Sequence, residues 1–324
     1  MSVMVFVEQR SGEVQNVSLE LLGKGKELAD RLDDKVCAVL LGYNVKRLCE
    51  ELIQYGADEV VCVDDENLDI YVTSTYTKAF CEVIKKKDPD IVLVGATTIG
   101  RDLAPRVSSS VETGLTADCT SLDIDDENNG LLMTRPAFGG NIMATIICPD
   151  HRPQMSTVRA GVMKKLEKDS SRTGTIENFS VDLSNEGKSI QVMDFIKENI
   201  KQVKIEDAKI LISAGRGLGS KENLDALYEL ADILGAEVSA SRAVVDAGWI
   251  DKNRQVGQTG KTVRPDLYIA CGISGAIQHI AGMEGSEYII AINTNPDAPI
   301  FENADLSIVG EVNKVVKNLI QELA

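Results

Sequence analysis

Hydroxyl, amide and cationic groups follow apolar runs at several points in the last third of the chain. They are Arg216 after the run 209–213, Ser241 and Arg242 at the end of 237–241, Ser274 after 267–270, and Gln258, Thr259 and Lys261 in a glycine-flanked loop. If the runs are parallel strands, their carboxyl ends meet at one edge of a sheet, where ligands bind. Cations and hydroxyls at such an edge suit a large phosphate-bearing ligand such as a dinucleotide. Surface arginines and ordinary turns are the alternative interpretation.

The segment 267–299 carries the clearest local pattern. It reads as a strand at 267–270, a glycine turn, a helix at 276–283 and a second strand at 288–293. Ser274 is placed to cap that helix, because a serine hydroxyl can accept a hydrogen bond from one of its free N–H groups. The free N–H groups and the helix dipole favour an anion such as a phosphate. Taken alone, the pattern is equally typical of an ordinary connection between a strand and a helix.

The elements that must hold these residues form a second domain of alternating strands and helices. Strands are expected at 209–213, 237–241, 267–270, 288–293 and 306–309, and helices from Ser220 to Leu234 and over 312–323. This alternation predicts an α/β fold with a doubly wound parallel sheet. The glycines at 215, 217 and 219 do not match the dinucleotide fingerprint GxGxxG, because the third glycine comes one residue early.

The first part of the chain alternates in the same way. Strands at 3–7, 36–41, 60–63 and 90–95, with helices at 18–32, 45–55 and 73–87, again predict a parallel sheet. The runs 119–126, 131–137, 141–148 and 154–160 are expected to be successive antiparallel strands, because turn residues separate them. After Gly95, the residues Thr97, Thr98 and Gly100 could hold a phosphate. Capping of the next helix by Thr98 is the favoured interpretation.

A charged segment from about residue 164 connects the two domains. Within it the sequence predicts a strand around 180–183 and a short helix around 193–200. We place the domain boundary near Ile205, so the expected domains are 1–204 and 205–324.

Composition excludes several kinds of partner and site. The formal net charge is −16 and both parts of the chain are acidic, so neither offers the basic face that nucleic acid or an anionic membrane requires. Seven cysteines stand singly, which favours free thiols in a reducing compartment over disulfides or a cysteine metal site. Two histidines exclude a histidine-rich metal site. Without a signal-like segment or an apolar run of membrane length, the sequence predicts a cytoplasmic protein that is not inserted in a membrane.

The ordered motifs of the second domain resemble those of a known family. They are Gly215-Arg216-Gly217, Ala240-Ser241-Arg242, Val256-Gly257-Gln258-Thr259-Gly260-Lys261, the run from Gly272 to His279, and the run from Ala291 to Phe301. Together they are similar to the electron transfer flavoprotein alpha subunit over nearly all of 209–324. The first domain is similar too, through Gly95-Ala96-Thr97 and Thr157-Val158-Arg159. The resemblance implies FAD held mainly by the second domain. It also implies a first domain of adenine-nucleotide α-hydrolase type, with a β-rich addition, that packs on a beta subunit.

The resemblance also implies roles for individual residues at the phosphate and adenosine end of FAD. Ser274 and Gly275, at the start of the helix, would hold the pyrophosphate with help from Ser241. Asn293 would contact the adenosine half. Glu311 stands where the family usually has aspartate, and its longer side chain would reach a ribose hydroxyl or the adenine.

Other residues would surround the isoalloxazine ring. Arg242 would lie beside the ring with Arg216 near it, and Thr259 would bond near N5, with Gln258 on the same loop. His279 would face the N1–C2=O end, either as a cation or as a neutral donor. A cation and a donor there would stabilise the negative charge of reduced flavin in a site of low dielectric. The expected contact set is completed by Val256, Gly257, Ala276, Ile277, Gln278 and Val312.

The function that the resemblance implies is electron carriage by a heterodimer with a beta subunit. FAD would take electrons from acyl-CoA or other flavin-dependent dehydrogenases, so the chain would be a carrier subunit rather than a self-sufficient enzyme. Two forms stay open, a simple carrier with AMP in the beta subunit and an electron-bifurcating form with a second FAD that oxidises NADH. The free cysteines and the lack of a targeting segment favour an anaerobic bacterium and hence bifurcation. The alternatives are a stand-alone dinucleotide-dependent dehydrogenase and a nucleotide-binding regulatory protein.

Overall fold

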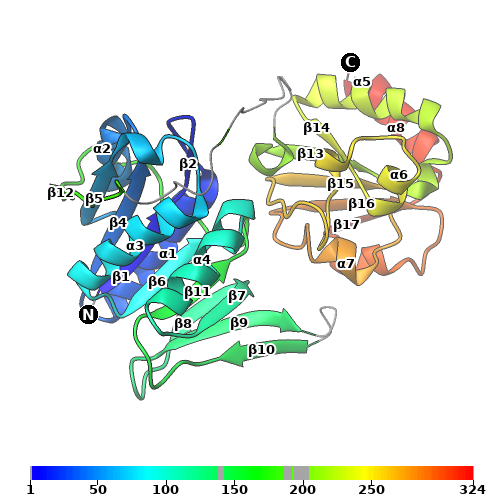
Figure 1. Cartoon of the computed structure of the whole chain (residues 1–324). Coiled ribbons are helices and arrows are strands. Elements are labelled where there is room, and N and C mark those ends of the chain that lie inside the picture. Colours follow the sequence, from blue (N-terminus) through cyan, green and yellow to red (C-terminus); the bar gives the residue numbers. More distant parts are fainter. Residues whose placement is uncertain (1, 138–141, 185–191, 193–203, 324) are drawn as a thin grey trace. The chain divides into compact units, whose positions relative to one another are not determined.

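The computed structural model describes all residues except 1, 138–141, 185–191, 193–203 and 324 (Figure 1). The chain divides into two compact units, residues 1–197 and 198–324. Each unit has its own parallel sheet and its own apolar cores. The domain boundary near Ile205 stays a prediction.

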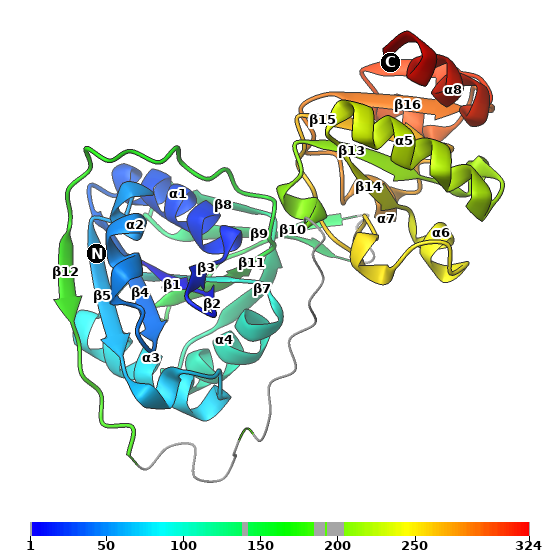
Figure 2. The ribbon, with the colours of Figure 1, turned by 90° about the horizontal axis from the view of Figure 1, so that it is seen from above.

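The described residues of the N-terminal unit form a seven-stranded parallel sheet in the order β12-β5-β4-β1-β6-β11-β7. The strands are β1 (Ser2–Val7), β4 (Lys35–Gly42), β5 (Glu59–Asp64), β6 (Ile91–Gly95), β7 (Leu115–Cys119), β11 (Gln154–Val158) and β12 (Thr175–Asn178). Its central strands are almost wholly apolar and buried, because helices cover both faces. One core contains α1 (Asn16–Arg31) and α2 (Cys49–Gln54), and the other contains α3 (Thr73–Lys87) and α4 (Thr98–Ser110) (Figure 2). A two-stranded hairpin, β2 (Gln9–Arg10) and β3 (Glu13–Val14), follows β1.

The β-rich addition differs from the prediction of four successive antiparallel strands. Only β8 (Ser121–Ile124), β9 (Leu131–Ala137) and β10 (Ile142–Ile146) pair in that way, as a three-stranded sheet. The expected antiparallel strand at 154–160 is wrong, since β11 runs parallel between β6 and β7 in the main sheet. All five β11 residues are buried, and two of their three polar side chains have hydrogen-bond partners, whereas Ser156 Oγ has none among the described residues. Gln154 Oε1 accepts from the Leu131 N–H at 2.9 Å, and Thr157 Oγ1 accepts from the Asp118 N–H at 2.9 Å.

Two other local predictions need correction. The connector strand lies at β12, not at 180–183, because the Thr175 and Phe179 N–H groups bond to the Asp58 and Cys62 carbonyls of the β5 region. The cap of α4 is Thr97, one residue before the expected Thr98, and its Oγ1 accepts from the Gly100 N–H at 3.0 Å. The helix expected at 193–200 lies outside the described residues.

The C-terminal unit has a five-stranded sheet in the order β14-β13-β15-β16-β17, and every neighbouring pair is parallel. The strands are β13 (Ile210–Ala214), β14 (Glu237–Ala240), β15 (Leu267–Cys271), β16 (Ile289–Asn293) and β17 (Leu306–Val309). This order is that of a doubly wound sheet, in which the chain turns back between β13 and β15. The fold class predicted from the sequence is confirmed.

The two faces of this sheet are covered differently. The helices α5 (Leu224–Leu234) and α8 (Val312–Leu323) pack together over one face (Figure 1). The other face is covered by the short helix α7 (Ile277–Ile280), a 3₁₀ turn at Pro299–Asn303 and the loop that leads from α6 (Arg242–Asp246) to β15. This second face is therefore covered mostly by irregular backbone, and that backbone includes the segments predicted to bind the ligand. In the described part of the chain, no helix is long and apolar enough to cross a membrane.

Candidate functional site

The carboxyl ends of the five parallel strands line one edge of the C-terminal sheet. Because all five strands are parallel, the polar residues that follow them lie along this edge. In sheet order they are Ser241 after β14, Arg216 after β13, Ser274 after β15, Asn293 at the end of β16 and Glu311 after β17. The structure thus brings together the strand ends that the sequence placed in one crevice.

Glycines bring the backbones of β13 and β15 into contact at the point where the chain turns back. The Gly217 N–H donates to the Gly272 carbonyl at 3.0 Å. Gly272 has a φ of +69°, and a Cβ on Gly215 would lie 2.2 Å from the Gly272 oxygen. Side chains are therefore excluded where the two strand ends meet, because the two backbones pack directly against each other. A phosphate group needs this kind of close approach to backbone.

The segment after β15 differs from its prediction in two details, the cap and the length of the helix. The residue at the N-cap of α7 is Ala276, and Ser274 makes no capping bond, so the predicted cap is wrong. Gly275 is the cause, because it has a φ of +89° and packs against the backbone at Ile300, whose N–H donates to the Ser274 carbonyl at 3.1 Å. The regular helix then spans only Ile277–Ile280, and turns continue it to Glu284. The Ser274 side chain is exposed at the sheet edge.

The loop that carries Gln258 and Thr259 is fixed to α7 through its backbone. The Gln258 N–H donates to the Gln278 carbonyl at 2.7 Å, and Gly257 packs against Gly282 with no space for a Cβ. Thr259 Oγ1 accepts from Gln255 Nε2 at 3.0 Å. Val256 and Gly257 are buried, so they position the loop, while Gln258 is half-buried and Thr259 is exposed.

The three cations of the site differ in their partners. Arg242 is exposed in α6, and its Nε pairs with Asp246 at 3.2 Å, an exposed pair that contributes little to stability. Lys261 pairs with Glu206. Arg216 is exposed and has no ion pair with a described residue. Both arginines are therefore available to an anionic ligand.

His279 is the one polar side chain of the predicted set that is buried, with 7% of its surface exposed. Its Nε2 lies 2.9 Å from the hydroxyl of Tyr268, on β15. Burial lowers the pKa of His279 to about 4, and the backbone of Val256 acts in the opposite direction. Of the two states that the sequence left open, cation or neutral donor, the structure therefore favours the neutral imidazole at pH 7.

The remaining predicted residues lie at or near the same edge. Ala276, Ile277 and Gln278 are exposed at the start of α7, where Ile277 exposes 48% of its surface. The Asn293 side chain already bonds within the chain, because Nδ2 donates to the Ile273 carbonyl and Oδ1 accepts from the Asn295 N–H, both at 2.9 Å. Glu311 is exposed and pairs with Lys314 at 3.0 Å, and Val312 is the buried first residue of α8.

Sequence reasoning missed the polar residues beneath this edge. They are Tyr268, Ser213, Ser239 and Gln255, all buried. A tyrosine in the middle of an apolar strand was a usable signal, because a buried phenol normally needs a hydrogen-bond partner. The serines in the strands gave the same signal in weaker form.

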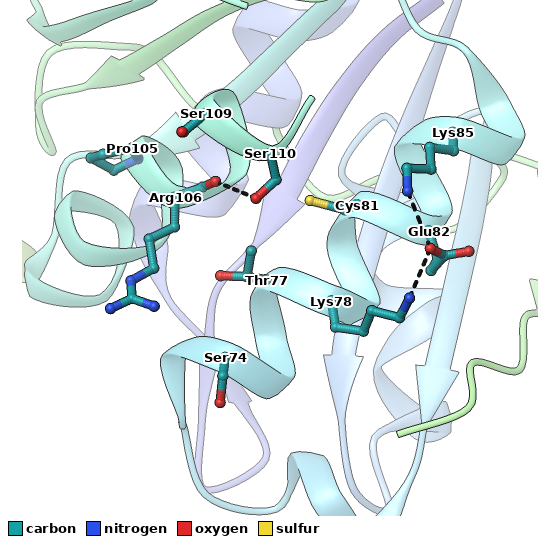
Figure 3. Close-up of a pocket in the computed structure, with 10 residues that line it drawn as sticks. All are labelled: Ser74, Thr77, Lys78, Cys81, Glu82, Lys85, Pro105, Arg106, Ser109 and Ser110. Carbon is teal, nitrogen blue, oxygen red and sulfur yellow. Dashed lines mark hydrogen bonds and ion pairs between the residues drawn. The ribbon is translucent and has the colours of Figure 1, made fainter. Parts of the chain in front are cut away.

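A pocket of about 570 Å³ lies in the N-terminal unit between α3 and α4 (Figure 3). Three cations line it, and two of them, Lys78 and Lys85, pair with Glu82 at 3.2 and 3.5 Å, while the third is Arg106. The pocket contains none of the predicted cofactor contacts. Among the described residues, no group of three histidine, cysteine or acidic side chains is arranged to hold a metal ion.

Comparison with known families and proteins agrees with this geometry. Residues 3–184 match the electron transfer flavoprotein domain, and residues 204–284 match the electron transfer flavoprotein FAD-binding domain. The chain is 54% identical over 323 residues to the electron transfer flavoprotein subunit alpha of Clostridium acetobutylicum, covering 99% of this chain and 96% of that one. It is 55% identical over 321 residues to the subunit alpha of Thermoanaerobacterium thermosaccharolyticum, covering 99% and 97%.

A more distant relative carries a more specific name. The lactate dehydrogenase (NAD(+),ferredoxin) subunit LctC of Acetobacterium woodii is 41% identical over 318 residues, covering 98% of this chain and 76% of that one. The two family domains and the two nearly full-length relatives named first all carry the electron transfer flavoprotein name. The chain therefore belongs to the electron transfer flavoprotein family as an alpha subunit, with FAD as its cofactor.

Proposed function

We propose that FAD binds along the carboxyl edge of the C-terminal sheet, with its pyrophosphate where β13 and β15 meet. The observation that supports this most directly is the contact between Gly215, Gly217 and Gly272, which leaves bare backbone beside two exposed polar residues. Those residues are Arg216 and Ser274. A hydroxyl and a guanidinium next to backbone without side chains suit a diphosphate better than an uncharged ligand.

The loop with Gln258 and Thr259, together with α6 and α7, would hold the isoalloxazine end. Bound FAD supplies the transfer of electrons, and the protein sets its potential and access. Arg242 would stabilise negative charge on the ring, because a cation nearby favours the reduced anionic form. Thr259 would orient the ring by a hydrogen bond near N5. Ile277 and Gln278 would exclude water from one side of it.

The adenosine half is proposed to extend toward β16 and β17. Asn293 bonds within the chain, so it would support the backbone around Ile273 and use its second amide hydrogen for the ligand. Glu311 would reach a ribose hydroxyl or the adenine after breaking its exposed pair with Lys314, which costs little.

We infer that the chain works as one half of a heterodimer with an electron transfer flavoprotein beta subunit, in a cytoplasmic setting. The dimer would carry electrons from acyl-CoA or other flavin-dependent dehydrogenases to later acceptors. A relative from Anaerotignum propionicum, 44% identical over 348 residues, is named as an electron transfer subunit of an acryloyl-CoA reductase. Its name supports a partnership of this kind.

An electron-bifurcating, NADH-linked role is the second candidate. It is favoured by the relative whose name couples NAD⁺ and ferredoxin. The two candidates differ in what the beta subunit holds, which is AMP in the simple carrier and a second FAD in the bifurcating form.

Co-purification of the chain with its beta subunit and analysis of the extracted cofactors would test both candidates. We expect FAD in every active preparation, and a preparation that lacks flavin would overturn the proposed site. Two FAD per dimer with reduction by NADH would support bifurcation. One FAD with one AMP would support the simple carrier.

A further inference from the structure

A cluster of polar side chains is buried beneath the proposed flavin-binding loop. It consists of Ser213 on β13, Ser239 on β14, Tyr268 on β15 and His279 on α7. The first three are 0% exposed and His279 is 7% exposed. Burying a polar group costs free energy of folding unless the group is hydrogen-bonded, so a cluster of four such residues needs an explanation.

Strand register explains how the cluster forms. Ser213 pairs with Ser239 across β13 and β14, so their side chains lie on the same face of the sheet. Tyr268 lies on that face as well, because Leu211, its partner on β13, precedes Ser213 by two residues. This is the face that α7 covers, and His279 projects from α7 onto it. Three strands and one helix therefore contribute one side chain each.

The hydrogen bonding of the cluster is incomplete among the described residues. Tyr268 and His279 share one bond, between the phenol oxygen and Nε2 at 2.9 Å. Among the described residues, Nδ1 of His279 is buried without a partner. The hydroxyls of Ser213 and Ser239 are also without a bond there, although both lie close enough to Tyr268 to lower its pKa against the rise that burial causes.

Proton placement in the Tyr268–His279 bond follows from its geometry. Among the described residues Nε2 is the one hydrogen-bond partner of the phenol, so the phenol proton is satisfied only when it points at Nε2. A neutral imidazole that accepts at Nε2 carries its own proton on Nδ1. The nitrogen without a partner is then a donor. The backbone of Val256, in the loop with Gln258 and Thr259, lies close enough to the imidazole to raise its pKa, but it makes no bond of normal geometry with Nδ1.

We propose that Tyr268 is a positioning residue that fixes His279 as the neutral Nδ1–H tautomer, so that this buried N–H is held ready for an acceptor on the bound cofactor. The proposal rests on the FAD site proposed above and adds a residue that lies one layer deeper, in the sheet. Tyr268 touches no ligand in this scheme. It acts through His279, because without the phenol both tautomers of the imidazole become accessible.

Nitrogen NMR of the full chain labelled with [¹⁵N]histidine would test the proposal directly. The chain has only two histidines, and replacing exposed His151 by Gln assigns the other signal. We expect one neutral tautomer of His279 at pH 7, with the proton on Nδ1, in the absence of FAD. A proton on Nε2, or a protonated imidazole, would overturn the proposal. This spectrum needs no variant of the cluster, so the test does not depend on a variant that folds.

The variant Tyr268→Phe removes only the hydroxyl. We expect the His279 signal to change to a mixture of tautomers, and the affinity for FAD to fall about 2- to 10-fold, the range for one ordinary hydrogen bond. The matched control is Tyr228→Phe on α5, a residue that is 46% exposed, where both readouts should stay unchanged. An unchanged tautomer in Tyr268→Phe would overturn the positioning role.

The two proposals fail separately in this experiment. If His279 has the expected tautomer but the chain, with its beta subunit, binds no FAD, then the proposed site fails and the Tyr268–His279 assignment stands. If FAD binds normally and the tautomer is the other one, the assignment fails and the site stands.

Discussion

Arg242 is a cation with little to hold it in place, since its one described ion pair is the exposed contact with Asp246. We expect Arg242→Ala to lower the flavin potential, because a cation near the ring favours the reduced anion. An interaction of about 1–2 kcal/mol corresponds to about 20–40 mV for a two-electron couple. Redox titration of the purified heterodimer measures this shift. The control is Arg264→Ala, which replaces an exposed arginine of the same unit. Equal flavin potentials in the wild type and both variants would show that Arg242 does not lie beside the ring.

The second prediction at the scale of residues concerns Ser274. Because Ser274 does not cap α7, its effects on stability and on FAD binding can be separated. The hydroxyl makes no capping bond, so Ser274→Ala should leave the melting temperature of the cofactor-free protein unchanged. Loss of one bond to a charged phosphate should weaken FAD binding about 10- to 100-fold. Flavin fluorescence during titration measures the affinity. Unchanged affinity would move the pyrophosphate away from this residue.

His279 makes stability depend on pH. Its pKa in the folded protein is about 4, below the ordinary 6.5, so the unfolded chain binds more protons between these two values. Stability should therefore fall as the pH drops through that window, by up to about 1.4 kcal/mol per pH unit. Urea unfolding at about pH 7.5 and about pH 5.5 measures it. We expect the wild type to lose about 1 kcal/mol more than His279→Asn between these conditions, whereas His151→Asn should behave like the wild type.

At the scale of elements, the turn after β15 is the most constrained part of the site. Gly275 has a φ of +89°, and a Cβ there would lie 2.1 Å from the Ile300 N. Gly275→Ala should therefore destabilise the protein by about 3 kcal/mol or more, because backbone on both sides must move. Gly235, at the end of α5, has a φ of +63° with nothing within 4 Å of its Cβ position. Gly235→Ala is the control and should cost about 1 kcal/mol in urea unfolding. Equal losses would show that crowding at Ile300 is unimportant.

The sequence predicted elements well where burial alone decides them. The strands of the C-terminal sheet are apolar runs between turns, and both α3 and α8 have the predicted bounds. The prediction failed at β11, because QMSTV has no apolar continuity and its place between β6 and β7 depends on distant partners such as the Leu131 and Asp118 N–H groups. The predicted cap of α7 was wrong for a similar reason. The contact between Gly275 and Ile300 joins two segments that are distant in the chain, and the local sequence pattern does not show it.

In the candidate site, too, local features could be predicted from the sequence and features that depend on distant contacts could not. Its edge could be predicted, because parallel strands must end together and the residues after them can be read directly. The buried layer could not, because the Tyr268–His279 bond depends on which face of β15 the phenol occupies and on where α7 crosses it. A serine in an apolar strand gives only a weak signal that its side chain is buried.

At the scale of the whole molecule, every proposed FAD contact lies in residues 198–324, a unit with its own cores. FAD should therefore stabilise this unit selectively, by about 2.7 kcal/mol at a free concentration 100 times the Kd. Hydrogen exchange of the chain with and without FAD resolves the two units. Protection should rise in β13, β15 and the loop 255–261, and stay unchanged in β1, β4 and β6. Equal protection of both units would mean that the cofactor also contacts the first one.

The position of β11 has a consequence for how the chain is made. This strand lies between β6 and β7 in space, but it is synthesised after both of them and after the β8-β9-β10 sheet. Until Val158 has left the ribosome, β6 presents an unpaired edge, and β7 has no neighbour in the main sheet. Exposed strand edges are sites of aggregation. During synthesis the N-terminal sheet therefore passes through a stage at which the strand between β6 and β7 is missing. A fragment that ends before Gln154 should be insoluble for that reason.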